Sequence, residues 1–245
     1  MISVVIPTLD AEATLGASLS ALLPAVVDGI VREVIVVDGG SRDRTLKIAD
    51  QAGVVLLTAP AGRGAQLATG AARARFPWLL FLHADTVLEP GWEREAGAFI
   101  DRVETERRAP AAAAFRFALD DTGLAPRCLE ALVRLRCLAL RLPFGDQGLL
   151  IPRALYVEVG GYEPLPIMED VAIARRLGRS RIALLRPRAI TSAARYRGDG
   201  YVSRVLRNQM CLALYFAGVP VARIARLYAR GTSVDRPAAR SFTST

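Results

Sequence analysis

Short apolar runs alternate with helix-like patterns through the first half of the chain. The runs predict four buried strands, at residues 2–6, 34–37, 54–57 and 78–82. The helical spacing between them is clearest at one face shared by Leu15, Leu19, Leu22 and Leu23. Strands joined by helices in this way predict an α/β fold. We expect a Rossmann-like, mostly parallel central sheet that is flanked by helices.

The regular alternation loosens after residue 85. The pattern predicts helices at 91–103, 124–142, 170–177, 201–217 and 221–228, with extended segments at 115–119 and 148–151. The sequence shows no internal repeat, low-complexity segment or long linker. We therefore expect one domain over 1–245, made of two halves (about 1–110 and 111–198) and C-terminal helices (about 200–230).

Composition places the chain in the globular class, with 52% hydrophobic and 23% charged residues. Its three cysteines lack paired spacing, which argues against a disulfide framework or a zinc site and suits a reducing, cytoplasmic setting. A strand pattern begins at once, so we expect no signal peptide. The longest charge-free stretch near the C-terminus, 208–222, is shorter than the roughly 20 apolar residues of a membrane-spanning helix.

The net charge of +8 is unevenly distributed, because residues 171–245 hold 15 arginines and two aspartates. Such clusters are typical of proteins that bind nucleic acid, an anionic membrane surface or a phosphate-bearing ligand. Lys47 is the only lysine, so a codon preference for arginine is an alternative explanation for part of the cluster.

Polar or glycine-rich groups follow every predicted strand of the first half. They are Pro7-Thr8-Leu9-Asp10 with Glu12, Asp38-Gly39-Gly40-Ser41, Gly62-Arg63-Gly64, and His83-Ala84-Asp85. Ligands of open parallel sheets bind beyond the carboxyl ends of the strands, so these groups predict a site. The first turn lacks the glycines of a dinucleotide site, and the chain has no Walker P-loop. A phosphate group would then be bound most simply through a metal.

Several segments together resemble the motifs of family 2 glycosyltransferases of the GT-A fold. In chain order they are SVVIPTLDAE, EVIVVDGGSRDRT, GRGAQLATGA, FLHADT, FGDQGLLIPR, GGYEPLPIMEDVAIARRL and TSAARYR. The resemblance covers about residues 1–198 and is closest to short bacterial members without membrane spans. Its strength lies in the order and spacing of the motifs.

The resemblance implies a nucleotide-sugar donor, which we expect to be a UDP sugar, bound by the first half of the chain. The residues implied in donor binding are Pro7, Thr8, Leu9, Glu12, Asp38, Arg63, Ala84 and Asp85. Alternative explanations are a turn role for Asp38, helix capping by Thr8 and Glu12, and a solvated Arg63. The resemblance implies no nucleic-acid partner.

His83-Ala84-Asp85 replaces the Asp-x-Asp motif of the family. Residues two apart on an extended segment point the same way, so both side chains can face one divalent cation, Mn²⁺ or Mg²⁺. The resemblance implies that Asp85 is a metal ligand. His83 is either a second ligand, which would favour Mn²⁺, or only a hydrogen-bond donor or packed side chain.

Glu169-Asp170 matches the acidic motif that supplies the family's general base, and Asp170 holds the corresponding position. Glu169 is the rival base, and acidic residues also favour a helix's first turn. Asp146 or Gln147 is implied to bind acceptor hydroxyls, with a loop turn as the alternative explanation. Arg195 and Arg197 are implied near the diphosphate. Ala-Ala-Arg-Tyr replaces the Gln-x-x-Arg-Trp of processive synthases, so we expect no processive synthesis.

The C-terminal helices carry an apolar stripe of Leu206, Met210, Leu214 and Ala217, with arginines at 204, 207, 223, 226 and 230. This pattern is typical of a core-packing helix with a solvated face. The alternative is peripheral contact with an anionic membrane at its inner face. Many relatives act on lipid or polyisoprenoid acceptors, which makes such an acceptor a candidate.

The sequence thus predicts an inverting, metal-dependent glycosyltransferase that moves a sugar to a hydroxyl or carboxyl acceptor. One alternative is a sugar-1-phosphate nucleotidyltransferase, although PTLDAEATLG lacks the glycine-rich loop and early basic residue of that class. The other is a non-catalytic nucleotide-sugar-binding module in which the altered His83-Ala84-Asp85 no longer supports turnover.

Overall fold

The computed structural model describes residues 1–105 and 111–230. The chain divides into two compact units, Met1–Ser192 and one that begins at Ala193, and their relative positions are not determined. The expectation of a single domain stays a prediction. Its internal boundary near residue 110 falls at 106–110, outside the described residues.

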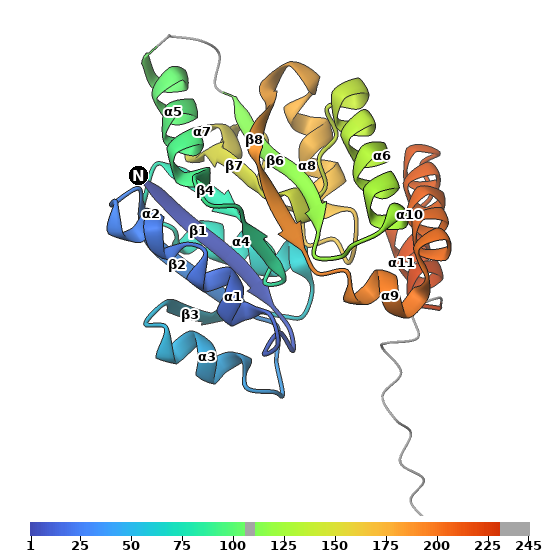
Figure 1. Ribbon diagram of the computed structural model, residues 1–245, viewed down its shortest axis with the longest axis horizontal. Helices are drawn as coiled ribbons and strands as arrows, with labels where there is room; N and C mark the ends of the chain where they lie inside the picture. The colour runs from blue at the N-terminus through green and yellow to red at the C-terminus, as the bar shows by residue number, and fades with distance from the viewer. Residues whose placement is uncertain (106–110, 231–245) are drawn as a thin grey trace, which may run out of the picture. The chain divides into compact units, whose positions relative to one another are not determined.

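Within the described residues, the first unit contains one eight-stranded sheet in the order β3-β2-β1-β4-β7-β6-β8-β5 (Figure 1). The strands are β1 (Ile2–Thr8), β2 (Val31–Asp38), β3 (Val55–Thr58), β4 (Trp78–Phe81), β5 (Thr86–Leu88), β6 (Ala112–Leu119), β7 (Leu149–Pro152) and β8 (Ile182–Thr191). The four strands predicted in the first half pair in parallel, and β6 pairs in parallel with β8. Strand β7 is antiparallel to both β4 and β6, and β5 is antiparallel to β8. The predicted α/β fold is confirmed.

The helices surround the sheet in the first unit and make up the second. Those of the first unit are α1 (Leu15–Ser20), α2 (Leu23–Val27), α3 (Thr45–Gln51), α4 (Arg63–Arg73), α5 (Trp92–Thr105), α6 (Leu124–Leu140), α7 (Arg153–Glu158) and α8 (Glu169–Leu177), with short 3₁₀ helices η1 (Gly145–Gln147) and η2 (Arg179–Arg181). The second unit contains α9 (Ala194–Asp199), α10 (Tyr201–Phe216) and α11 (Val221–Arg230). No described helix is long and apolar enough to cross a membrane.

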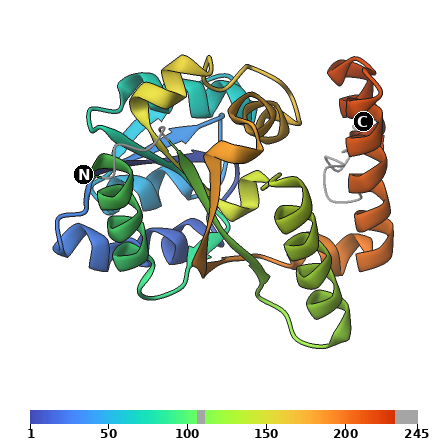
Figure 2. The same cartoon turned by 90° about the horizontal axis from the view of Figure 1, so that it is seen from above.

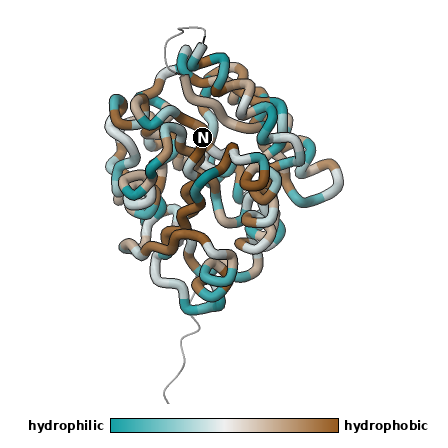
Figure 3. The backbone as a smooth tube through the Cα atoms, turned by 90° about the vertical axis from the view of Figure 1, so that its left-hand side faces the viewer, coloured by the Kyte–Doolittle hydropathy of each residue, from teal (hydrophilic) through white to brown (hydrophobic). Residues whose placement is uncertain are grey.

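Helices cover both faces of the sheet (Figure 2). Alternate side chains of β1 point to opposite faces, so Ile6 joins a buried cluster with Leu15 of α1 and Trp92 of α5. On the other face, a Cβ at Gly70 of α4 would collide with Val5, so this close helix–strand contact requires glycine. Figure 3 shows the resulting alternation of hydrophobic and hydrophilic segments along the backbone.

Two expectations from the hydrophobic pattern were wrong. The first helix face ends early, because Leu23 is exposed and begins the separate helix α2, with Pro24 in its first turn. The strand at 115–119 does not alternate, since in β6 only Arg116 is exposed. Helices pack on β6, since Phe115 contacts the Trp92 ring of α5 and the Leu119 N–H donates to Glu130 of α6, and both faces of the strand are buried.

Candidate functional site

The parallel strands bring the predicted polar segments to one edge of the sheet. Thr8 at the end of β1 lies in register with Asp38 at the end of β2. Strand β4 pairs with the other side of β1, and the segment His83–Asp85 follows it directly. The edge predicted from the strand ends therefore exists as one continuous feature.

The carboxylate of Asp38 is buried and shapes its own loop. Its Oδ2 accepts hydrogen bonds from the backbone N–H groups of Gly40 and Ser41, both at 2.8 Å. Its Oδ1 accepts from the hydroxyls of Thr8, at 3.1 Å, and of Ser41. Burial acts to raise the pKa of Asp38, but these hydrogen bonds outweigh it and hold the pKa below the usual value. A nucleotide base would have to displace one of these partners.

The segment after β1 is fastened to the loop after β2. Glu12 accepts hydrogen bonds from the backbone N–H and the Nε of Arg44, at 3.0 and 3.2 Å, and these lower its pKa. The backbone N–H of Glu12 donates to Asp43 at 2.9 Å. Pro7 is buried within β1, whereas Leu9 is exposed. Of these predicted donor-binding residues, Leu9 and Glu12 lie at the surface.

Gln66 of α4 holds the ends of β1 and β2 together, a role that the sequence analysis did not predict. Its buried side-chain amide donates to the carbonyls of Thr8, at 2.7 Å, and Val37, at 2.8 Å. On the opposite side of the edge, the carbonyl of the buried Ala84 accepts from the Ser18 hydroxyl at 2.9 Å. These contacts fix the backbone on both sides of Thr8.

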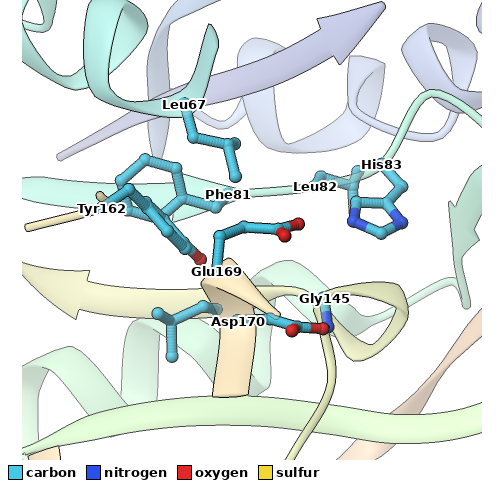
Figure 4. A pocket seen from close by; sticks show the side chains of 9 residues that line it. Leu67, Phe81, Leu82, His83, Gly145, Tyr162, Glu169 and Asp170 are labelled. Atoms are coloured by element: carbon cyan, nitrogen blue, oxygen red, sulfur yellow. The ribbon is translucent and has the colours of Figure 1, made fainter. Parts of the chain in front are cut away.

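A small hollow lies where the end of β4 meets the start of α8 (Figure 4). It is lined by Leu67, Phe81, Leu82, His83, Gly145, Leu149, Tyr162, Glu169 and Asp170. Met168 precedes α8 with a φ of 64°, in the left-handed region. That conformation costs a non-glycine residue about 1–2 kcal/mol. Such strain tends to persist at functional sites, where the surrounding structure holds it in place.

Glu169 is buried at this hollow, with 1% of its side chain exposed. Figure 4 shows its carboxylate pointing into the space between Leu67 and His83. Its Oε1 lies 3.0 Å from Arg63 Nε, yet neither carboxylate oxygen accepts a hydrogen bond from the described residues. Burial raises the pKa of Glu169 to about 7, against a lowering by Arg63 and with a further increase from Asp170. Burial in this hollow therefore favours the protonated form of Glu169.

Asp170 turns towards the loop before β7. Its Oδ2 accepts a hydrogen bond from the backbone N–H of Gly145 at 2.8 Å, and its Oδ1 accepts from Val171 N–H at 2.7 Å. A Cβ at residue 145 would lie 2.6 Å from His83 Nε2, so only glycine allows this approach. Gly145 thereby places His83 and Asp170 side by side, although they come from distant parts of the chain.

Asp146 and Gln147, predicted together near the acceptor, occupy different surroundings. The Oδ1 of Asp146 is buried and accepts no hydrogen bond from the described residues. Gln147 is buried, its amide donating to the Phe115 carbonyl at 2.9 Å while its Oε1 accepts from Phe144 N–H at 3.2 Å. Gln147 therefore supports the η1 turn from within, and only Asp146 remains a candidate for contact with a ligand.

Negative charge accumulates around Asp146. Burial raises the pKa of Asp146 to about 6. Of the nearby charged groups, Arg136 and Arg63 lower this pKa, whereas Asp170 and Asp85 raise it. The carboxylates of Asp85, Asp146 and Asp170 thus interact electrostatically at this edge of the sheet. The buried Oδ1 of Asp146 accepts no hydrogen bond from the described residues, which favours the binding of a cation. No group of three or more His, Cys, Asp or Glu in the described part of the chain could hold a metal ion. A cation here would need further oxygens, such as those of a diphosphate.

The predicted diphosphate residues Arg195 and Arg197 lie in the second unit. Both are exposed on α9. Because the relative positions of the units are not determined, the structure does not bring these arginines to the edge that holds Asp85. Their role in diphosphate binding stays a prediction.

The comparison with protein families identifies the chain. The sequence model of glycosyl transferase family 2 matches residues 3–136, just over half of the chain. The chain belongs to this family. The resemblance seen in the motifs is confirmed. Among curated proteins, none matches this glycosyltransferase family member significantly.

Solved structures share the fold of this glycosyltransferase family member at low sequence identity. One is glucosyl-3-phosphoglycerate synthase from Mycobacterium tuberculosis in complex with Mn²⁺, UDP and glucosyl-3-phosphoglycerate. Its TM-score is 0.58 at 23% identity, over 90% of this chain and 81% of that one. Another is S. aureus TarS 1–349, with a TM-score of 0.61 at 19% identity, over 93% and 69% of the two chains. These likenesses confirm the GT-A fold.

The raised pKa of Glu169 predicts a pH-dependent stability that Glu169→Gln removes. Between about pH 4.5 and 7 the folded state binds the Glu169 proton more tightly than the unfolded state, so the free energy of unfolding falls as pH rises. The full effect is on the order of 3 kcal/mol. We expect the variant to lose less thermal stability than the wild type between pH 5 and 8. If the wild type and Glu169→Gln lost the same thermal stability between pH 5 and 8, the prediction would be wrong. Glu163→Gln, which changes an exposed glutamate, is the control.

Proposed function

We propose that the protein transfers a sugar from a UDP sugar to a hydroxyl or carboxyl acceptor, with inversion at the anomeric carbon. The observation that carries the proposal is the meeting of the β4 end with the α8 start, where Gly145 lies against both His83 and Asp170. Family membership supports the reaction class. Structures of the similar glucosyl-3-phosphoglycerate synthase contain Mn²⁺ and UDP-glucose, which supports the choice of donor and metal.

Asp170 is the proposed general base. In the reaction the acceptor oxygen would attack the anomeric carbon while the bond from that carbon to the diphosphate breaks, and the acceptor's proton would pass to the Asp170 carboxylate. The Gly145 N–H bond to Oδ2 orients this carboxylate. Glu169 is less suited to be the base, because it is buried and pairs with Arg63. Its unfilled oxygens could instead accept hydrogen bonds from donor sugar hydroxyls.

Asp85 is the proposed metal ligand, with Asp146 beside it. A bound divalent cation, Mn²⁺ or Mg²⁺, would neutralise the charge that develops on the departing diphosphate. The mutual repulsion of Asp85, Asp146 and Asp170 favours such a cation. Thr8, Asp38 and Glu12 would then line the nucleoside pocket, and Arg63 would lie near the phosphates.

A lipid or polyisoprenoid acceptor, membrane contact through the C-terminal helices and a cytoplasmic location at the membrane's inner face stay predictions. In their support, Val202, Leu206 and Met210 form an exposed apolar row on α10.

A nucleotide panel in thermal-shift measurements tests the proposal. We expect UDP and a UDP sugar to raise the melting temperature when Mn²⁺ is present and to have little effect without it. Ligand at a hundred times its dissociation constant contributes about 2.7 kcal/mol, a shift of a few degrees for a chain of this size. Stabilisation by NAD or S-adenosylmethionine in place of UDP would overturn the proposal. Metal-dependent turnover of UDP-glucose would distinguish an enzyme from a binding module.

A further inference from the structure

Arg136 of α6 contacts the short turn η1 at the candidate site. Its guanidinium carbon lies 3.5 Å from the centre of the Phe144 ring. Its Nε donates to the Leu142 carbonyl at 3.2 Å, and its Nη2 donates to Gln147 Oε1 at 3.3 Å. This one side chain therefore binds the chain both before the turn and at the last residue of the turn.

These contacts converge on the side-chain oxygen of Gln147. Besides Arg136, the Phe144 N–H and the Cys137 thiol donate to this oxygen, each at 3.2 Å. The amide nitrogen of the same side chain is held as well, because it donates to the buried Phe115 carbonyl at 2.9 Å. Gln147 is therefore a fixed point on which Arg136 and the turn both rest.

The turn is too short to move independently of these contacts. Only Gly145 and Asp146 lie between Phe144 and Gln147 in the sequence. The Gln147 N–H donates to the Phe144 carbonyl at 3.0 Å, which closes the turn. The Asp146 carbonyl is held from β8, where Thr191 Oγ1 donates to it at 3.2 Å. Loss of the α6 contacts would therefore displace mainly the Gly145 side of the turn.

We infer that Arg136 is a positioning residue for sugar transfer, and this inference rests on the proposed role of Asp170 as general base. Arg136 acts through Phe144 and Gln147 on Gly145, whose N–H donates to Asp170 Oδ2 at 2.8 Å. That hydrogen bond orients the carboxylate towards an acceptor hydroxyl. A misplacement of about 1 Å in such a group can lower a reaction rate roughly 100-fold.

The contacts of Arg136 use the shape of the guanidinium as well as its charge. A planar guanidinium can lie against an aromatic ring and donate from several nitrogens at once, as this one does to the Leu142 carbonyl and Gln147 Oε1. The ammonium group of a lysine is a compact charge without a planar face. Lysine at position 136 would therefore keep the charge and lose the geometry.

Steady-state kinetics of Arg136→Met test the positioning role. Methionine keeps an unbranched stem but removes the stacked guanidinium and both of its hydrogen bonds. We expect kcat to fall about 10–100-fold. The KM for the UDP sugar should stay within about two-fold of the wild-type value, with the Mn²⁺-dependent thermal shift by UDP unchanged. Arg134→Met, which changes an exposed arginine of the same helix, is the matched control and should behave like the wild type.

A double variant distinguishes positioning of the base from a general loss of structure. Once Asp170→Asn has removed the base, the addition of Arg136→Met should lower the remaining rate by less than about three-fold. A second loss as large as that of the single variant would overturn the inference. So would an unchanged kcat in Arg136→Met, or a loss that appears in KM rather than in kcat. Full activity of Arg136→Lys would assign the effect to charge alone and would also overturn it.

The same measurements distinguish failure of this inference from failure of the proposed function. No turnover of a UDP sugar by the wild type, or full activity of Asp170→Asn, would overturn the proposed function and the inference with it. A fully active Arg136→Met beside an impaired Asp170→Asn would overturn the positioning role alone. If Arg136→Met does not fold, Phe144→Leu takes its place in the double variant, because it removes the ring on which the guanidinium stacks. Its expected loss of kcat is about 3–10-fold.

Discussion

Asp170→Asn is expected to lower the rate of sugar transfer by about 10²–10⁴, the usual contribution of a general base. The asparagine keeps the size of the side chain and an oxygen that can accept from Gly145 N–H, but it cannot take the acceptor's proton. Donor binding should therefore be unchanged. The measurements are the turnover of the UDP sugar that stabilises the protein most, and the thermal shift that this donor produces.

Two variants make the Asp170 result interpretable. Asp101→Asn removes an exposed carboxylate from α5 and should keep the wild-type rate. Glu169→Gln distinguishes the two neighbouring acids. Full activity of Asp170→Asn, combined with a large loss for Glu169→Gln, would assign the base to Glu169.

The first four strands could be predicted because each is a short, nearly continuous apolar run. Strand β8 was missed although it has ten residues, because arginines interrupt its pattern and Pro187 lacks a backbone donor. The structure accommodates Pro187 at an irregularity in the β6–β8 pairing, between Ala114 and Arg116. Such a bulge depends on the partner strand, which a local pattern does not reveal.

The edge of the sheet that holds the candidate site could be predicted from topology, but the contacts of several of its residues could not. Parallel strands that end at one edge are enough to bring Thr8, Asp38 and Asp85 together. Whether Asp38 is already hydrogen-bonded within its loop, or Gln147 is buried, depends on long-range packing. The ion pair between Arg63 and Glu169 joins two helices far apart in sequence, so no local motif announces it.

The acidic edge would allow the proposed metal and the proposed base to coexist. Asp85 and Asp170 both raise the pKa of Asp146, whereas Arg136 and Arg63 lower it. A divalent cation near Asp85 would relieve this repulsion and favour an ionised Asp146. The cation would thus add positive charge to this acidic edge, so that the negatively charged diphosphate could bind there.

Asp85→Asn is expected to abolish the metal-dependent part of UDP binding and to lower the transfer rate at least about 100-fold. The neutral amide has the shape of the carboxylate but loses the charge that holds a divalent cation. Titration of Mn²⁺ against the UDP-induced thermal shift measures this directly. His83→Ala decides the role left open for the histidine, because a metal ligand would shift the Mn²⁺ midpoint whereas a packed side chain would leave it in place. An unchanged Mn²⁺ dependence in Asp85→Asn would move the metal site elsewhere, with Asp146→Asn as the next variant to test.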